Sequence, residues 1–348
     1  MDRVDGDLRK RSDVTRRRNL QPVVTRPNSN PAECVCELCA RRKGFTFPRA
    51  LADEVKAGRA VVFAGSGIST EDRAVFPYTL YEDISGELNQ KKAKISFPEL
   101  IDRYCKEPNG RARFLRKVTD RFGYIDSFPE LYRGATSFHR EISTIYQFEN
   151  IITTNWDDYF ERECGATPFV YPEDFALWDL PGRKVFKIHG SINNFGSLVA
   201  SSQDYKECYR RLQTGVVGGA LKTLLATRTI IYVGYSFEDT DFKKITEIIT
   251  KEMKGTKPHS YFVTLDETAP VNFGKDFTVI VTEGTHFIEV LKEHLVAEKA
   301  MLPDTVFDAL QIILLRVQTL HDQVQEISLR KHPTILLTLC YQDGLIHA

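Results

Sequence analysis

Three polar residues follow two short apolar runs of this 348-residue chain, at positions that suit proton-transfer chemistry. Asn155 and Asp157 come after the run NIITT, and His189 comes directly after KVFKI. An amide and a carboxylate can hydrogen-bond a ribose or a carboxamide, and a histidine moves protons most easily near neutral pH. The three side chains therefore predict a site that binds a sugar-like substrate and transfers a proton.

Each of these residues also has an ordinary structural interpretation. Asn155 is suited to cap the helix that follows it. A single histidine is more often structural than catalytic. Taken one at a time, these residues leave both interpretations open.

Two small, glycine-containing turns follow other apolar runs. The first turn contains Ala64, Gly65, Ser66 and Ser69, and the second contains Gly234 and Ser236. Glycine lets the backbone approach a ligand closely, and backbone N–H groups beside a helix start bind phosphate. The first turn lacks both the full dinucleotide fingerprint and the P-loop lysine, so it is equally suited to be a plain connection.

The elements that must position these residues alternate along the chain. Short, continuous apolar runs predict buried strands, and helical segments separate them. This pattern is typical of strands covered on both faces of a parallel sheet, and it predicts an α/β fold with a Rossmann-like, doubly wound parallel sheet. The predicted strands are RAVVFA before Gly65, Asn150–Thr153, Lys184–Ile188, Thr229–Val233, Ser260–Leu265 and Thr278–Val281. Ligands of such sheets bind outside the carboxyl ends of the strands, which is where the polar residues lie.

The chain divides into three predicted regions. Residues 1–47 are rich in arginine and proline and predict a mobile basic arm, and 48–300 form the α/β domain with a helical insert at about 77–148. That insert lies between the first glycine turn and the second strand, where it is placed to act as a lid. Residues 301–348 form a C-terminal helical extension, with one long helix from Pro303 to about Lys331. Its apolar stripe predicts packing on its own domain or a subunit contact.

Composition indicates a core-forming protein of balanced charge. Hydrophobic residues make up 42% of the chain, and 47 basic residues match 47 acidic ones. The balance gives no reason to expect general attraction to nucleic acid or membrane, although the run Arg16–Arg18 leaves nucleic-acid contact open. Without an apolar signal segment or membrane span, we expect a cytoplasmic protein. Three of its seven cysteines, Cys34, Cys36 and Cys39, could bind metal or stay reduced.

Four segments together, AGSGIS, TTNWD, KIHGS and YVGYS, resemble the landmarks of the sirtuin-like (silent-information-regulator-two) superfamily over about residues 48–297. The resemblance implies that NAD⁺ is the substrate and that Asn155 and His189 are catalytic, with Asn155 holding a water beside the nicotinamide ribose. Asp157 would face the nicotinamide carboxamide. The remaining implied NAD-binding residues are Ala64, Gly65, Ser66 and Ser69 near the pyrophosphate, and Gly234 and Ser236 near the adenosine.

The sequence departs from protein-deacylating sirtuins in one respect. Those enzymes carry a zinc ribbon of two cysteine pairs after the histidine, whereas the stretch between His189 and Gly234 contains a single cysteine, Cys208, so we expect no zinc ribbon and no metal site there. The resemblance to the ribbon-free branch implies an NAD⁺ hydrolase that releases nicotinamide and ADP-ribose in bacterial antiphage defence. It also implies a homo-oligomer, and a second defence protein such as a ring-forming DNA-translocating ATPase. A protein deacylase or ADP-ribosyltransferase, and a non-catalytic sensor of an NAD-derived signal, remain open.

Overall fold

In the described part of the chain, seven parallel strands form a single sheet in the order β3-β4-β2-β1-β5-β6-β7. The computed structural model describes residues 40–89, 95–235, 243–244, 246–248, 258–267, 277–325 and 330–347. The strands are β1 Ala60–Ala64, β2 Asn150–Thr153, β3 Thr167–Phe169, β4 Lys184–Lys187, β5 Thr229–Val233, β6 Ser260–Thr264 and β7 Phe277–Val281. This arrangement confirms the predicted α/β fold with its doubly wound parallel sheet.

The edge strand β3 is the strand that the sequence pattern did not predict. It has three residues with Pro168 in the middle, and it pairs with β4 alone. Proline cannot donate a ladder hydrogen bond and is confined to the edges of sheets. So short a segment, with a proline at its centre, becomes a strand only because β4 lies beside it.

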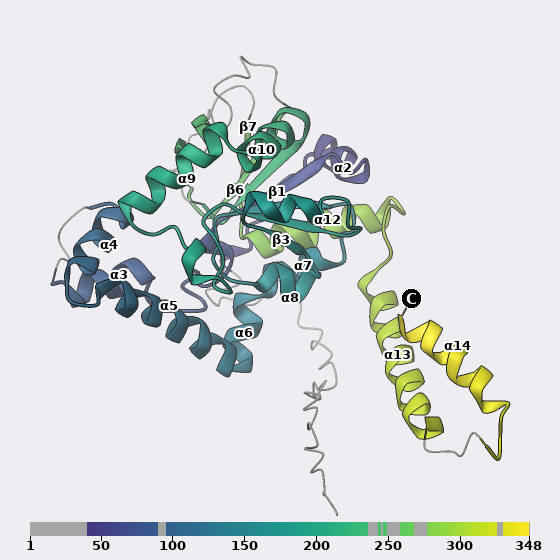
Figure 1. Ribbon diagram of the computed structural model, residues 1–348. Coiled ribbons are helices and arrows are strands. Elements are labelled where there is room, and N and C mark those ends of the chain that lie inside the picture. Colours follow the sequence, from purple (N-terminus) through teal and green to yellow (C-terminus); the bar gives the residue numbers. More distant parts are fainter. Residues whose placement is uncertain are drawn as a thin grey trace, which may run out of the picture.

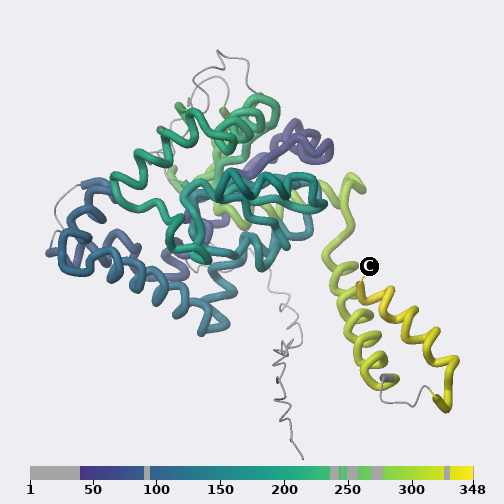
Figure 2. Tube along the Cα trace, in the orientation of Figure 1, coloured from purple at the N-terminus to yellow at the C-terminus, as the bar shows by residue number. Residues whose placement is uncertain are grey.

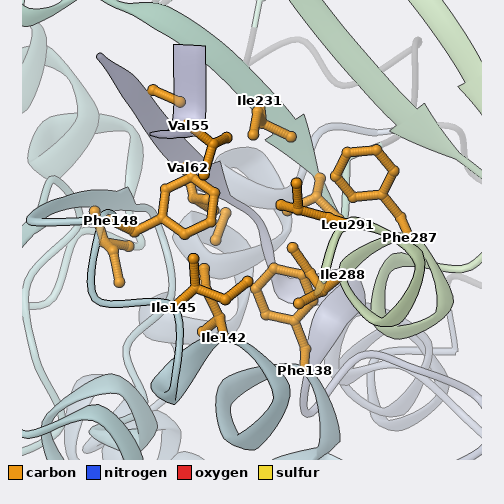
Figure 3. Close-up of a cluster of buried hydrophobic side chains, with 14 of the residues drawn as sticks. Val55, Val62, Phe138, Ile142, Ile145, Phe148, Ile231, Phe287, Ile288 and Leu291 are labelled. Carbon is orange, nitrogen blue, oxygen red and sulfur yellow. The ribbon is translucent and has the colours of Figure 1, made fainter. Parts of the chain in front are cut away.

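Helices cover both faces of the sheet, which explains why its strands are apolar throughout. Helices α2 (Arg49–Lys56), α7 (Ser137–Ser143), α8 (Tyr159–Cys164) and α12 (Gly284–Ala297) cover one face, while α9 (Ser202–Thr214) and α10 (Val216–Thr227) cover the other. Successive side chains of a strand point to opposite faces. Val62 therefore packs with Phe138, Ile142 and Leu291 (Figure 3), while the next residue, Phe63, packs on the α9–α10 side.

A helical module lies between β1 and β2. It consists of α3 (Leu80–Glu87), α4 (Phe97–Lys106), α5 (Gly110–Ser127) and α6 (Pro129–Ala135). The module has a small core of its own, which includes Leu100, Phe114 and Val118. Arg111 joins it to the main domain through hydrogen bonds to Asp204 and the Leu198 carbonyl, both 2.9 Å long. The module is therefore held beside the carboxyl edge of the sheet.

The C-terminal extension is a helical hairpin: most of the predicted long helix is present, and a second helix, which the sequence pattern did not predict, follows it. Helix α13 (Asp304–Gln325) is followed by a turn at residues 330–331 and by α14 (Ile335–His347). Pro333 precedes α14, and a residue before proline is disfavoured in the helical conformation. Figures 1 and 2 show the hairpin extending away from the rest of the molecule. Its apolar stripe does not pack on its own domain, because Leu310 and Ile313 are 49% and 58% exposed.

The last residues of the predicted N-terminal arm pack on the domain. Phe45 and Phe47 both stack on Phe287 of α12, with ring centroids 5.9 Å apart in each pair. The carbonyl of Lys43 accepts a hydrogen bond from Thr282 Oγ1. The ordered domain thus begins before residue 48. Residues 16–18 and the cysteines at 34, 36 and 39 lie outside the described residues.

None of the helices in the described part of the chain has the length and apolar character needed to cross a membrane.

Candidate active site

The turns after β1 and β5 lie against each other at the carboxyl edge of the sheet. Gly65 N–H donates to the Val233 carbonyl over 2.8 Å, and Gly67 N–H donates to the Gly234 carbonyl over 3.0 Å. A Cβ on Gly65 would lie 2.6 Å from the Gly234 oxygen, and Gly234 itself has φ +75°. Strand β1 pairs with β2 on one side and β5 on the other, so these turns occupy the switch point where doubly wound sheets bind ligands.

A cavity of about 240 Å³ opens beside these turns. The three predicted polar residues all line it: Asn155, Asp157 and His189 are only 4%, 3% and 5% exposed. Ser66 also lines the cavity from the first turn. The structure therefore brings together side chains from the ends of β1, β2 and β4.

Ser69 connects two of the candidate site residues. Its hydroxyl donates to Asp157 Oδ2 over 2.9 Å and accepts a bond from Asn155 Nδ2 over 3.3 Å. Ser69 is 1% exposed, so this network is shielded from bulk water. Burial raises the pKa of Asp157, although the nearby charge of Lys187 and the Ser69 bond oppose the effect.

The structure also rules out the helix-cap interpretation of Asn155. Helix α8 begins at Tyr159, and Asp158 occupies its cap position. The Asn155 amide nitrogen binds Ser69, and its buried Oδ1 has no hydrogen-bond partner among the described residues. Buried polar atoms are normally paired, so an unpaired acceptor in a residue that lines a cavity fits a ligand that donates a hydrogen bond there. A ribose hydroxyl or a water molecule has this chemistry.

His189 follows β4 and is held there by its backbone and by an aromatic contact. The amide of Val199 donates to the His189 carbonyl over 3.0 Å. The His189 ring meets the ring of Tyr205 nearly edge-on, with centroids 5.0 Å apart. Gly190 follows with φ +88°, a conformation that L side chains rarely adopt. The imidazole is thus held at the cavity wall.

A second hollow of about 310 Å³ lies on the other side of the glycine turns. Gly67 and Gly234 line it, together with Thr264, Asp266 and Glu283 from the ends of β6 and β7. Two adjoining hollows at a switch point fit the two halves of a dinucleotide. Ser236, the other predicted adenosine-side residue, lies outside the described residues.

Ala64 and Gly65 support the loops by their backbones. The Ala64 carbonyl accepts bonds from Thr153 Oγ1 over 2.9 Å and from the Tyr235 hydroxyl over 3.1 Å. Tyr235 OH also lies 2.9 Å from Thr154 Oγ1. The ends of β1, β2 and β5 are thereby joined beneath the cavity.

A buried ion pair fixes the segment that carries Asn155 and Asp157. Lys187 Nζ, at the end of β4, donates to Glu161 Oε1 over 2.8 Å and to the Asp157 carbonyl. The Lys187 side chain is fully buried. Burial raises the pKa of Glu161, and the Lys187 charge opposes that shift.

Several residues of the cavity wall were not predicted from the sequence. Thr154, Trp156 and Tyr235 stand inside the segments singled out above, so their position at strand ends was a usable signal. No sequence signal indicated Tyr205 of α9 or Arg121 of α5. The helical module also contributes Leu80, Tyr81, Phe97, Val118 and Phe122.

Cys208, the single cysteine after His189 and before Gly234, is buried in the core. Its thiol contacts the Ile188 carbonyl over 3.5 Å. Within the described ranges, no group of three histidine, cysteine or acidic side chains is arranged to hold a metal ion.

A comparison with family models matches residues 149–277 to the SIR2-like domain. Over this segment the chain is similar to the SIR2-like domain. The match begins just before β2 and ends at the start of β7, so it includes the segments of Asn155, His189 and Gly234.

Curated proteins that are similar to this chain include two named NAD(+) hydrolase ThsA. That of Cytobacillus dafuensis is 30% identical over 193 residues, covering 53% of this chain and 37% of the relative. That of Enterococcus faecium is 26% identical over 215 residues, covering 60% and 43%. Defense-associated sirtuin 2 of Bacillus subtilis is 21% identical over 255 residues, covering 71% and 23%. The chain thus matches less than half of the length of each of these relatives.

Two solved structures of Sir2 proteins are also similar to this chain. A Sir2 homologue in complex with NAD has a TM-score of 0.43 and 15% identity, covering 74% of this chain and 98% of that one. A structure described for the mechanism and regulation of Sir2 enzymes has a TM-score of 0.39 and 13% identity, covering 72% and 98%.

Proposed function

We propose that this protein hydrolyses NAD⁺ at the bond between nicotinamide and ribose, and releases nicotinamide and ADP-ribose. The observation that carries the proposal is the convergence of Asn155, Asp157 and His189 on one buried cavity beside the glycine turns. The two relatives named NAD(+) hydrolase support it. The nicotinamide half occupies the first cavity, and the adenosine half occupies the hollow beyond Gly234.

The residue types suit this reaction. Breaking the bond leaves positive charge on the anomeric carbon, while nicotinamide departs as a neutral group with the bonding electron pair. One water adds to that carbon and gives up one proton, so the products are nicotinamide, ADP-ribose and a proton. Asn155 holds the water or a ribose hydroxyl through its unpaired Oδ1, and His189 accepts the proton.

Asp157 orients the substrate instead of moving a proton. Its carboxylate already accepts the Ser69 hydroxyl, and it faces the nicotinamide carboxamide, whose N–H groups are donors. Because the bound substrate is already oriented, less entropy is lost on the way to the transition state.

The biological role follows from the same reaction. Depletion of NAD⁺ in the cytoplasm during phage infection would stop the infected cell, and the relative named Defense-associated sirtuin 2 supports a defence role. In this role the enzyme is held inactive until it is triggered, and a second defence protein, such as a ring-forming DNA-translocating ATPase, acts with it. Nucleic acid would be contacted only through the N-terminal arm.

The C-terminal hairpin joins two copies of the chain. Ten large apolar side chains of α13 and α14 are 39% or more exposed: Leu310, Ile312, Ile313, Leu314, Leu315, Leu320, Leu336, Leu337, Tyr341 and Leu345. Exposed apolar side chains in this number mark an interaction site, and a second hairpin presents the same side chains.

The deciding experiment incubates the purified protein with NAD⁺ and follows nicotinamide and ADP-ribose by chromatography. Asn155→Ala and His189→Ala are compared with Asn193→Ala and His259→Ala, which change exposed residues of the same types. We expect nicotinamide and ADP-ribose in equal amounts from the wild type and the two controls, either alone or once the defence partner is added, and neither product from the two site variants.

Three results would contradict the proposal. Nicotinamide release that requires an acyl-lysine peptide would indicate a deacylase, and transfer of ADP-ribose to a protein would indicate a transferase. Binding of NAD⁺ without turnover, even with the candidate partner present, would indicate a sensor.

A further inference from the structure

We propose that Arg121 is a positioning residue, which holds the helical module closed over the candidate active site and fixes Ser69 through the backbone. This inference rests on the proposed function for its kinetic consequence, but its structural part stands independently. Arg121 belongs to α5, far in sequence from the landmark segments, and is 8% exposed. A guanidinium is costly to bury unless its donors are used.

The guanidinium of Arg121 binds two backbone carbonyls from one segment. Its Nη2 donates to the Thr70 carbonyl and to the Tyr78 carbonyl, both over 2.9 Å. The first carbonyl lies just after the glycine turn, and the second lies just before α3. One side chain therefore ties both ends of the segment 70–78 to the middle of α5.

Two further contacts fix the guanidinium itself. Glu71 Oε1 lies 3.2 Å from Nη2, and Glu71 Oε2 accepts the N–H of Leu80 over 2.9 Å. The ring of Phe76 lies under the guanidinium, 4.1 Å from its central carbon to the ring centroid, as in a cation–π contact. These polar contacts of Arg121 all involve Nη2, so a lysine ammonium could replace part of them, but lysine lacks the flat guanidinium that lies against the aromatic ring.

The Arg121 contact reaches the candidate catalytic residues through one peptide bond. Thr70 follows Ser69, and Ser69 is hydrogen-bonded to Asp157 and to Asn155. The bond to the Thr70 carbonyl restrains the backbone next to Ser69 and so supports both side chains. Arg121 therefore acts on substrate through Ser69.

Arg121 also separates two hollows. It lines the cavity that holds Asn155 and His189, and it lines a broad outer groove of about 800 Å³ on the helical module. Arg121 is the residue that these two sets of lining residues share. Loss of its bonds would let the groove and the cavity join and admit water to the site.

The test compares Arg121→Met and Arg121→Lys with Arg116→Met, a matched control. Arg116 is an exposed residue of the same helix that lines only the outer groove. The binding probes are nicotinamide riboside for the first cavity and adenosine monophosphate for the second hollow, measured by calorimetry. Hydrogen exchange of the full chain reports on the amides of residues 70–82.

We expect Arg121→Met to weaken nicotinamide riboside binding on the order of 10-fold or more, to leave adenosine monophosphate binding unchanged, and to speed exchange at residues 70–82. Arg121→Lys should restore part of each loss, and Arg116→Met should match the wild type. In turnover, KM for NAD⁺ should rise as kcat falls.

The outcomes separate this inference from the proposed function. If Arg121→Met weakened the binding of both probes equally, Arg121 would merely support the fold. If hydrogen exchange at residues 70–82 stayed unchanged in that variant, Arg121 would not hold the helical module closed. Both readouts remain decisive if the wild type does not hydrolyse NAD⁺. A chain that bound neither probe would be judged by hydrogen exchange alone.

Discussion

The hydroxyl of Ser69 donates a 2.9 Å hydrogen bond to Asp157 Oδ2 across 88 residues of sequence. This bond joins the turn after β1 to the segment after β2, and it satisfies one oxygen of a carboxylate that is 3% exposed. Parallel pairing of β1 with β2 ends both strands at the same edge, which is why two distant segments meet there. A buried carboxylate is costly, so this arrangement has consequences for stability.

Asp157→Asn should stabilise the folded protein at neutral pH while it weakens NAD⁺ binding. Burial raises the folded-state pKa of Asp157 above the ordinary value of 3.8, so the ionised form is disfavoured in the folded state. Wild-type stability therefore falls as pH rises from 3.8 through the raised pKa. The variant should lack this fall. Denaturant unfolding at several pH values measures it, and parallel pH profiles for the two proteins would contradict the assignment.

Lys187 and Glu161 should be strongly coupled. Lys187→Met alone leaves the buried Glu161 without its cation, and removing one partner of a buried pair costs about 3–5 kcal/mol. The double variant Lys187→Met/Glu161→Leu should recover most of that loss. A double-mutant cycle in urea gives the coupling energy. If the losses in unfolding free energy of the two single variants added up in the double variant, the two charges would act independently.

Gly234→Ala should be more damaging than Gly182→Ala. Both glycines have positive φ, +75° and +98°, which strains any other residue by about 1–3 kcal/mol. A Cβ at Gly234 would also lie 2.6 Å from the Gly65 oxygen, whereas a Cβ at Gly182 meets nothing within 4 Å. Overpacking adds about 1–3 kcal/mol at Gly234. Thermal unfolding compares the two, and equal losses would refute the close contact of the turns.

The C-terminal hairpin should control self-association. Ile312→Glu with Leu337→Glu places two charges on side chains that are 67% and 74% exposed, so the fold should survive while the apolar surface is interrupted. Gln311→Glu is the matched control, because it adds a charge at the neighbouring position of α13. Light scattering should find a smaller assembly for the double variant alone. If the double variant had the same mass as the wild type in light scattering, the hairpin would not join two copies of the chain.

The sequence by itself determined the sheet and the three polar residues of the site. Continuous apolar runs specify strands that are buried on both faces, and a parallel sheet places the residue after each strand at one edge. Asn155, Asp157 and His189 could therefore be predicted to meet, because local pattern and topology were enough. The same reasoning failed for β3, whose three residues become a strand only through pairing with β4.

Tertiary structure alone decided what encloses the cavity and what supports it. Arg121 and Tyr205 lie on amphipathic helices, where periodicity indicates a buried face but not the partner that it meets. Lys187 is part of the apolar run KVFKI, and only the fold places Glu161 beside it. The course of the chain beyond α13 also depended on the three-dimensional structure, since a helical pattern does not reveal where a hairpin turns back. Contacts between distant segments depend on packing, which no local pattern of residues encodes.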